Sequence, residues 1–89
     1  MMEVEFLDKF YKDLDKISLK SVKNSLSRLI EDVESAQNLS EIPNTKKLKG
    51  HKSAYRFRIG DYRVGVFYEG QKVTFARVVH RKDIYSVFP

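Results

Sequence analysis

The spacing of apolar and polar residues divides the chain into a helical first half and a second half of strands. Residues 2–6 alternate loosely and predict a short first strand. Residues 8–17 and 18–36 repeat apolar side chains at spacings of three and four, which predicts two amphipathic helices. Asp8 and Ser18 stand where N-terminal caps of these helices are expected.

From residue 53 onward the hydrophobic period changes to two, which is typical of strands. Residues 53–59 and 62–68 predict an antiparallel hairpin. Gly60 and Asp61 form its turn, with glycine in the first position that a type II′ turn prefers. Residues 72–79 are mostly apolar, which favours a strand buried on both faces of the sheet.

The two segments that remain lack a clear period. Residues 37–47 are rich in loop-forming side chains and predict a loop, whereas residues 84–88 could add a short terminal strand. The resulting order is β-α-α-β-β-β. It predicts an α+β fold in which an N-terminal strand and a two-helix hairpin pack on one face of a small antiparallel sheet.

The Gly60-Asp61 turn also fixes which side chains share a face of the hairpin. With this turn Arg58 lies opposite Arg63, so both project from one face together with Arg56. The opposite face is expected to meet the helices. Its members are Tyr55, Phe57, Ile59, Tyr62, Val64, Val66 and Tyr68.

Directly opposed arginines repel each other, so stability alone does not explain Arg58 facing Arg63. An anion bound between them removes the conflict, and phosphate suits planar guanidinium groups. Gly65, opposite Arg56, leaves space for a backbone or ligand to approach. The alternative is that the arginines are solvated on an open sheet face.

Composition bounds the class of protein. The 89 residues, 42% of them hydrophobic, are enough for a single domain over residues 1–89. Cysteine is absent, which excludes disulfides and thiolate catalysis and favours a cytoplasmic location. No membrane span or secretory signal is recognisable. The basic half has few carboxylates, so we expect no metal site and no cofactor.

Charge is unevenly distributed along the chain. Residues 1–44 hold nine acidic and six basic side chains, whereas residues 45–89 hold three acidic and eleven basic ones. Such a positive face attracts polyanions, and interleaved basic and aromatic side chains suit single-stranded nucleic acid. The candidate RNA-binding residues are Lys46, Lys47, Lys49 and Lys52. The candidate catalytic residues are Arg56, Arg58, Arg63, His80, Arg81 and Tyr85.

The stretch KKLKGHKSAYRFRIGDYRVGVFYEGQKVTFARVVHRKDIYSVF resembles the C-terminal half of RelE/ParE-superfamily toxins, through "KLKG", "YRFRIGDYRV" and "HRKDIY". The two preceding helices agree with this family. For a RelE-type member, the resemblance implies a toxin that cleaves mRNA in the ribosomal A site and is neutralised by a cognate protein antitoxin. By similarity the functional positions fall on Arg56, Arg58, Arg63, Arg81 and Tyr85.

RelE toxins carry lysine where this chain has Arg56 and Arg58. Arginine cannot lose its proton in a protein, so these two residues bind phosphate but are poor general bases. We therefore expect His80 to carry the proton, because its ordinary pKa is nearest neutrality. Two alternatives remain open. ParE-type members poison DNA gyrase without cleaving RNA, and a basic nucleic-acid-binding module would have no enzymatic activity.

Overall fold

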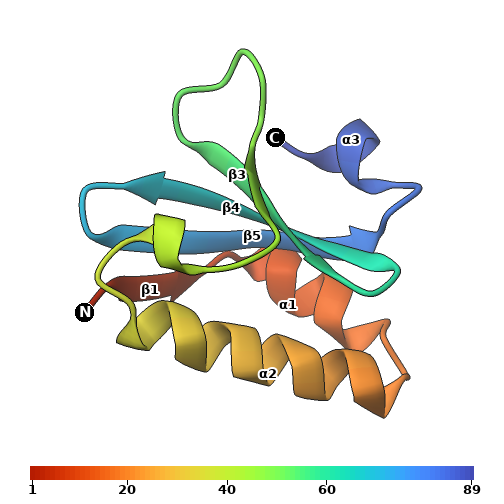
Figure 1. Cartoon of the computed structure of the whole chain (residues 1–89). Coiled ribbons are helices and arrows are strands. Elements are labelled where there is room, and N and C mark those ends of the chain that lie inside the picture. Colours follow the sequence, from red (N-terminus) through yellow and green to blue (C-terminus); the bar gives the residue numbers. More distant parts are fainter.

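The computed structural model describes residues 1–89, and both predicted helices are present in it (Figure 1). The elements in chain order are β1 (Glu3–Phe6), α1 (Asp8–Asp15), α2 (Lys20–Ser35), the 3-10 helix η1 (Leu39–Glu41), β2 (Thr45–Lys47), β3 (Ala54–Ile59), β4 (Tyr62–Glu69), β5 (Lys72–His80) and α3 (Ile84–Val87). None of the helices has both the length and the apolar character needed to cross a membrane.

The strands form one five-stranded sheet in the order β1-β5-β4-β3-β2. α1 and α2 cover one face of it, shown below the strands in Figure 1, which confirms the expected α+β fold. The sheet is mixed and not wholly antiparallel, because β1 pairs in parallel with β5. α1, α2 and the strands β2, β3 and β4 lie between β1 and β5 in the chain, so the two parallel neighbours are far apart in sequence.

The main core lies between the helices and the sheet. It contains 15 buried side chains, among them Phe10 of α1, Val33 of α2, Phe57 of β3 and Phe75 of β5, all at most 1% exposed. The residues predicted for the helix-facing side of the hairpin all belong to this core or pack against it. The prediction that this alternate set of β3 and β4 side chains faces the helices is therefore confirmed.

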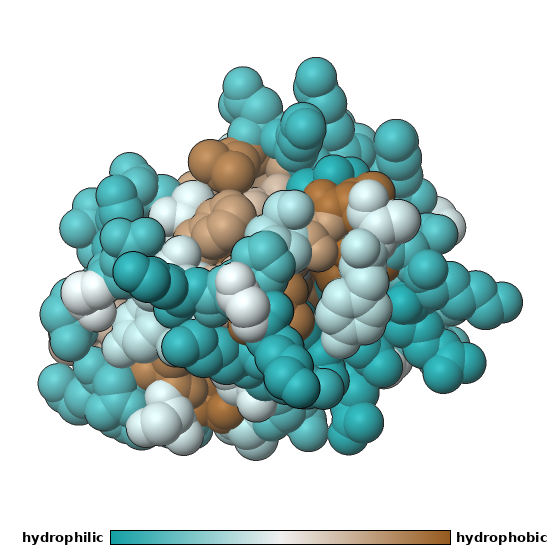
Figure 2. All heavy atoms as spheres, turned by 90° about the horizontal axis from the view of Figure 1, so that it is seen from above, coloured by the Kyte–Doolittle hydropathy of each residue, from teal (hydrophilic) through white to brown (hydrophobic).

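A second, smaller core covers part of the outer face of the sheet, where Figure 1 shows α3 and the loop before β3. Its buried members are Leu48, Ala54, Ala76, Ile84 and Phe88. Seen from above in Figure 2, this face consists mainly of polar side chains with apolar patches between them. β5 contributes to both cores, so its predicted burial on two faces is confirmed.

Four local predictions were wrong. Leu7 and Leu19 occupy the N-cap positions of α1 and α2, and neither helix has a side-chain cap from Asp8 or Ser18. In place of the strand expected at residues 84–88, Ile84–Val87 form the helical turn α3 and Phe88 follows it. The expected loop at residues 37–47 contains both η1 and the edge strand β2.

An irregularity interrupts the pairing of β4 with β5. Gly65 lies opposite Arg77, and the next residue, Val66, lies opposite Phe75. Ala76 is therefore an extra residue in β5, which makes this site a β-bulge. Beyond the bulge, the alternation of side chains along β5 is shifted by one residue.

α1 is attached to β5 by a buried carboxylate. Asp13, 5% exposed, accepts hydrogen bonds from Arg77 Nε at 2.7 Å and Arg77 Nη2 at 3.0 Å. It also accepts the backbone N–H of Val78 at 3.1 Å, in the part of β5 that β1 does not cover. The bidentate contact with Asp13 raises the pKa of Arg77 above its ordinary value.

Candidate functional site

The β3–β4 hairpin has the register predicted from its turn. Ile59 pairs with Tyr62, Arg58 with Arg63, and Arg56 with Gly65. Gly60 has a φ of 59°, as the first turn residue of a type II′ hairpin requires. The structure thus places Arg58 and Arg63 directly opposite each other.

The guanidinium groups of these two residues are held differently. Arg63 Nη1 donates to the carbonyl oxygens of Gly60 at 2.8 Å and Tyr62 at 3.0 Å, so its own turn fixes it in place. Arg58 is exposed, and its Nη2 lies 3.5 Å from Asn44 Oδ1, at the limit of a hydrogen bond. Arg58 is therefore free to approach a ligand, while Arg63 is already oriented.

Tyr85 joins the cluster from α3. Arg56 Nε donates a hydrogen bond of 3.1 Å to Tyr85 Oη. The tyrosine is 61% exposed, so its ring is open to stacking by a planar group. β3 and α3 together thus place a cation and a phenol side by side on the outer face.

Positive charge concentrates around Arg63. Partial burial lowers its pKa, and the charges of Arg56, Arg58 and Arg81 lower the pKa further. Of these four arginines only Arg81 pairs with a carboxylate, and that pair with Asp61 is long, at 3.8 Å between Nε and Oδ1. An anion entering this arginine cluster would relieve the mutual repulsion. Nowhere in the chain do three His, Asp or Glu side chains form a metal-ligating group.

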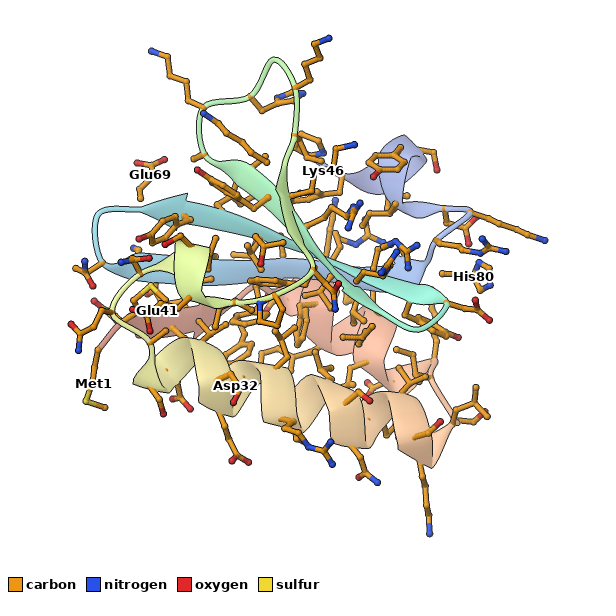
Figure 3. The ribbon with its side chains drawn as sticks, viewed as in Figure 1. Met1, Asp32, Glu41, Lys46, Glu69 and His80 are labelled. Atoms are coloured by element: carbon orange, nitrogen blue, oxygen red, sulfur yellow. The ribbon has the colours of Figure 1, made fainter.

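His80 is not brought into the arginine cluster. It pairs with Tyr62 at the end of β5, and the two rings lie 5.7 Å apart in an edge-to-face arrangement. Tyr62 belongs to the helix-facing side, and His80 lines a hollow there with Asp13 of α1 and with Lys16, which follows that helix. Its Nδ1 accepts the backbone N–H of Lys82 at 3.1 Å. The expected proton carrier, labelled in Figure 3, therefore lies at the end of β5 on the helix-facing side, whereas the arginine cluster is on the outer face.

The predicted RNA-binding lysines do not share one surface. Lys46 and Lys47 project from opposite sides of β2, and Lys49 and Lys52 lie in the loop that follows it. Lys46 pairs with Arg56 and lies above the sheet near α3 (Figure 3). Lys46 and Lys49 line an outer hollow of about 370 Å³ together with Tyr85. Lys52 lies on the same loop, beside a neighbouring hollow. These three lysines extend the positive surface away from the arginines.

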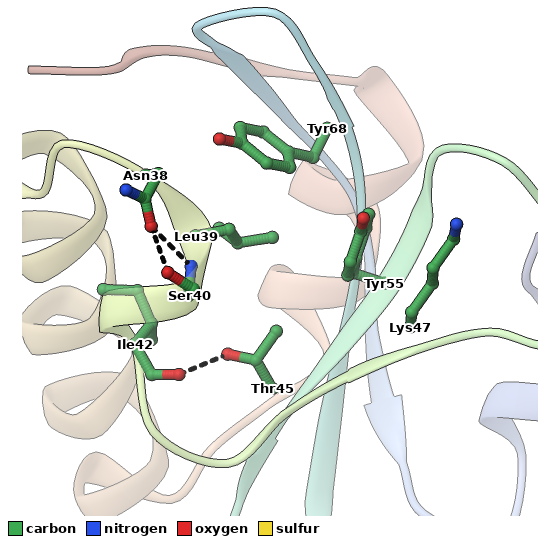
Figure 4. A pocket seen from close by; sticks show the side chains of 8 residues that line it. All are labelled: Asn38, Leu39, Ser40, Ile42, Thr45, Lys47, Tyr55 and Tyr68. Atoms are coloured by element: carbon green, nitrogen blue, oxygen red, sulfur yellow. Dashed lines mark hydrogen bonds between the residues drawn. The ribbon is translucent and has the colours of Figure 1, made fainter.

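Lys47 lies elsewhere. It pairs with Tyr55 and lines a separate hollow of about 410 Å³ at the η1 side of the sheet (Figure 4). Tyr68 borders the same hollow, its ring edge-to-face with that of Tyr55 at 5.8 Å. In η1, Asn38 Oδ1 accepts the backbone N–H of Ser40 at 3.0 Å. This hollow shares no residue with the arginine cluster.

The sequence predicted open space for a ligand at Gly65, but the ring of Phe88 fills that space. A Cβ atom at Gly65 would lie 2.6 Å from the ring of Phe88. Phe88 was expected in a terminal strand, so the sequence did not identify it as a neighbour of the site. The four-residue spacing of Ile84 and Phe88, one turn of helix, was the signal that could have identified it.

Comparison with known proteins agrees with this architecture. The model of the family described as "ParE toxin of type II toxin-antitoxin system, parDE" matches residues 4–85. Toxin RelE3 of Methanocaldococcus jannaschii is 36% identical over 89 residues, covering 99% of this chain and 100% of that protein.

Solved structures show the same relationship. The RelB–RelE antitoxin–toxin complex from Methanococcus jannaschii matches with a TM-score of 0.82 and 34% identity, over 96% of this chain and 99% of that chain. The YoeB dimer from Staphylococcus aureus, 15% identical, shares the fold with a TM-score of 0.73 over 90% of this chain and 97% of its own. The chain therefore belongs to the RelE/ParE superfamily of type II toxin–antitoxin toxins.

Proposed function

We propose that this toxin is an RNA endonuclease that cleaves mRNA on the ribosome and thereby inhibits translation. The observation that supports this most is the group of Arg56, Arg58, Arg63 and Tyr85 on one face, largely free of carboxylates. Cations of this geometry suit a phosphodiester, and an exposed tyrosine suits an unpaired base. The 36% identity to Toxin RelE3 supports placing this chain on the RelE side of the superfamily.

In the proposed reaction the RNA 2′-hydroxyl attacks the adjacent phosphorus atom, and the bond to the 5′-oxygen of the next nucleotide breaks. Arg63, already oriented by its turn, and the exposed Arg58 hold the two non-bridging oxygens. Arg56 and Arg81 add to the field that stabilises the extra negative charge of the phosphorane. Holding the phosphate also aligns the attacking and leaving oxygens.

Two protons must move in this reaction. The arginines stay charged and cannot accept a proton. His80 faces the helices and so is set aside as the carrier. Tyr85 is the remaining side chain of the cluster with an exchangeable proton on a neutral group, and Arg56 donates to its oxygen. We assign Tyr85 to proton transfer, or to stacking on a base with water carrying the protons.

A second candidate function has its own support. The family model that matches residues 4–85 describes a ParE toxin, and ParE-type members poison DNA gyrase. The arginine cluster together with Tyr85 favours RNase activity, because the sheets of ParE-type members usually lack this full set of basic and tyrosine positions.

The proposed partner is a protein antitoxin, as in the RelB–RelE complex that shares the fold. An acidic, initially disordered segment that folds on binding would complement the basic half of this chain. Co-expression with such a partner should restore the growth of cells that produce the toxin.

The test is to add the purified chain to a reconstituted translation extract and map the 5′ ends of the mRNA. Site-specific cuts that need ribosomes support the proposal. The Arg63→Gln variant is the matched control, because it removes the oriented cation without touching either core. Intact mRNA, together with DNA breaks when gyrase is present, would establish the alternative.

A further inference from the structure

The contact between Phe88 and Gly65 is unusually close. Phe88 is 4% exposed, and its ring lies over the one position of β4 that has no side chain. A Cβ atom there would lie 2.6 Å from ring atoms Cγ and Cδ2 and 2.9 Å from Cδ1. Gly65 has no positive φ, so its backbone does not require glycine. Glycine is needed at this position because any side chain would collide with the ring of Phe88.

Phe88 is one of two anchors that hold α3 on the sheet. Ile84 is fully buried, Phe88 nearly so, and the Phe88 N–H donates to the Ile84 carbonyl at 2.8 Å. The ring of Phe67 lies 5.1 Å from that of Phe88 and holds it laterally. Tyr85 stands between these anchors and is itself 61% exposed. Its place is therefore set by its neighbours and not by its own burial.

We call Gly65, the position over which the ring lies, the seat of Phe88. This seat is next to the arginine cluster. Gly65 is the direct partner of Arg56 across the hairpin, so Phe88 lies beside the strand position from which Arg56 projects. Three residues earlier in the chain, Tyr85 Oη accepts the hydrogen bond of Arg56 Nε at 3.1 Å. A single paired position of β3 and β4 thus carries both the arginine and the seat of the anchor.

We propose that Phe88, seated on Gly65, is a positioning residue that holds Tyr85 against Arg56. Its effect on catalysis rests on the proposed RNase function, whereas its effect on the Arg56–Tyr85 contact does not. Loss of the seat releases the end of α3 and leaves Tyr85 free to leave Arg56. The main core lies on the other face of the sheet and does not depend on this contact.

The experiment uses Phe88→Ala, which empties the seat, and Gly65→Ala, which obstructs it. The first readout is the NMR signal of the Arg56 Nε–H group, assigned by its absence in Arg56→Lys. In both variants the chemical shift of this signal should move to the value found in the Tyr85→Phe variant, and the Nε–H proton should exchange faster with water. The second readout is ribosome-dependent cleavage, whose kcat should fall about a hundredfold while KM changes little.

Rescue separates positioning from general stability. Phe88→Leu keeps an apolar side chain over Gly65 and should retain most of the Arg56 signal and the activity. Combined with Gly65→Ala it should restore what Gly65→Ala alone loses, because leucine has no rigid ring and its Cγ and Cδ atoms can move away from the new Cβ. Val87→Ala, on the exposed side of the same helix, is the control and should change neither readout.

The two proposals fail in different ways. If folded Phe88→Ala and Gly65→Ala both keep the wild-type Arg56 signal, the positioning role is overturned, whatever the activity. If the wild-type protein cuts no RNA but the Arg56 signal moves as described, the RNase proposal fails and the positioning role stands. If Phe88→Ala does not fold, the Arg56 signals of Gly65→Ala and of Gly65→Ala combined with Phe88→Leu test the positioning role instead.

Discussion

Replacing Arg58 with Gln separates the effect of the Arg58–Arg63 pair on stability from its effect on RNA cleavage. Arg58 is exposed, and its only side-chain hydrogen bond is the 3.5 Å contact with Asn44. Little favourable energy is therefore lost with the guanidinium. Its repulsion of Arg63 disappears, and the cost of that repulsion is comparable to the roughly 0.2–1 kcal/mol that a favourable cross-strand pair contributes. For a domain of this size, 1 kcal/mol corresponds to roughly 4–8 °C in Tm. The Tm of the variant should hold steady or rise by at most that amount.

The effect on cleavage should be far larger than the effect on stability. Removing one donor that stabilises a developing negative charge costs about 10²–10³ in kcat. The assay is mRNA cleavage in a translation extract, read beside thermal unfolding of the same samples. Lys20→Gln, at the exposed start of α2, removes a positive charge outside the arginine cluster and should leave both Tm and cleavage unchanged.

Two outcomes would refute this reasoning. If Arg58→Gln lowers Tm by many degrees, the arginine has a structural role and the anion between Arg58 and Arg63 is unnecessary. If cleavage and growth arrest persist at the wild-type level, the arginine pair does not hold the scissile phosphate. The gyrase-poison alternative would then move ahead.

Three further predictions test other parts of the molecule. Asp13→Ala should lower the free energy of unfolding by about 3–5 kcal/mol in urea titrations, because Arg77 loses its bidentate partner and the Val78 N–H its acceptor; an unchanged midpoint would contradict this. Affinity for single-stranded RNA should fall steeply with salt, and a flat plot of log affinity against log salt would show that the basic face is not the binding surface. Glu5 raises the pKa of Lys72 above its ordinary 10.5, so this pair stabilises the fold fully below that pH and less as pH rises through the folded-state pKa. The alkaline fall in Tm should be shallower in Glu5→Gln, and an identical fall would refute the linkage.

The hairpin and its arginines could be predicted because the determinants are local. Gly60 and Asp61 close the turn in two residues, and a two-residue loop leaves one register in which every apolar side chain faces the helices. Once the turn is known, the opposition of Arg58 and Arg63 follows by counting. The helices were equally accessible, although their caps were not, since backbone geometry can start a helix without a side-chain acceptor.

His80 illustrates what the sequence could not indicate. Counting alternate residues from Val73 and Phe75 places Arg77 and Val79 toward the helices and His80 on the outer face. Beyond the extra residue Ala76 the alternation is shifted, so that Val78 and His80 face the helices, while Arg77 beside the bulge still reaches Asp13 of α1. A bulge depends on the fit between two strands, and no residue type in β5 marks it in advance.

The C-terminal segment was misassigned for a related reason. Ile84, Tyr85, Ser86, Val87 and Phe88 fit a strand or a helical turn equally well by pattern. The choice is made by the seat at Gly65, which is 23 positions away from Phe88 and accepts a ring arriving from α3. β2 was missed because three residues, Thr45–Lys47, are too few to show a period.

The parallel pairing of β1 with β5 has a consequence for the order of folding. Glu3 meets Lys72 across 69 positions of sequence, whereas the β3–β4 hairpin closes over two residues. Contacts between distant positions incur a large entropic cost of loop closure, so they form late on the folding pathway. Truncation of Val64 in the hairpin should therefore slow refolding, whereas truncation of Val4 in β1 should mainly accelerate unfolding. The edge of β5 that β1 covers is thus the last part of the sheet to become protected from solvent.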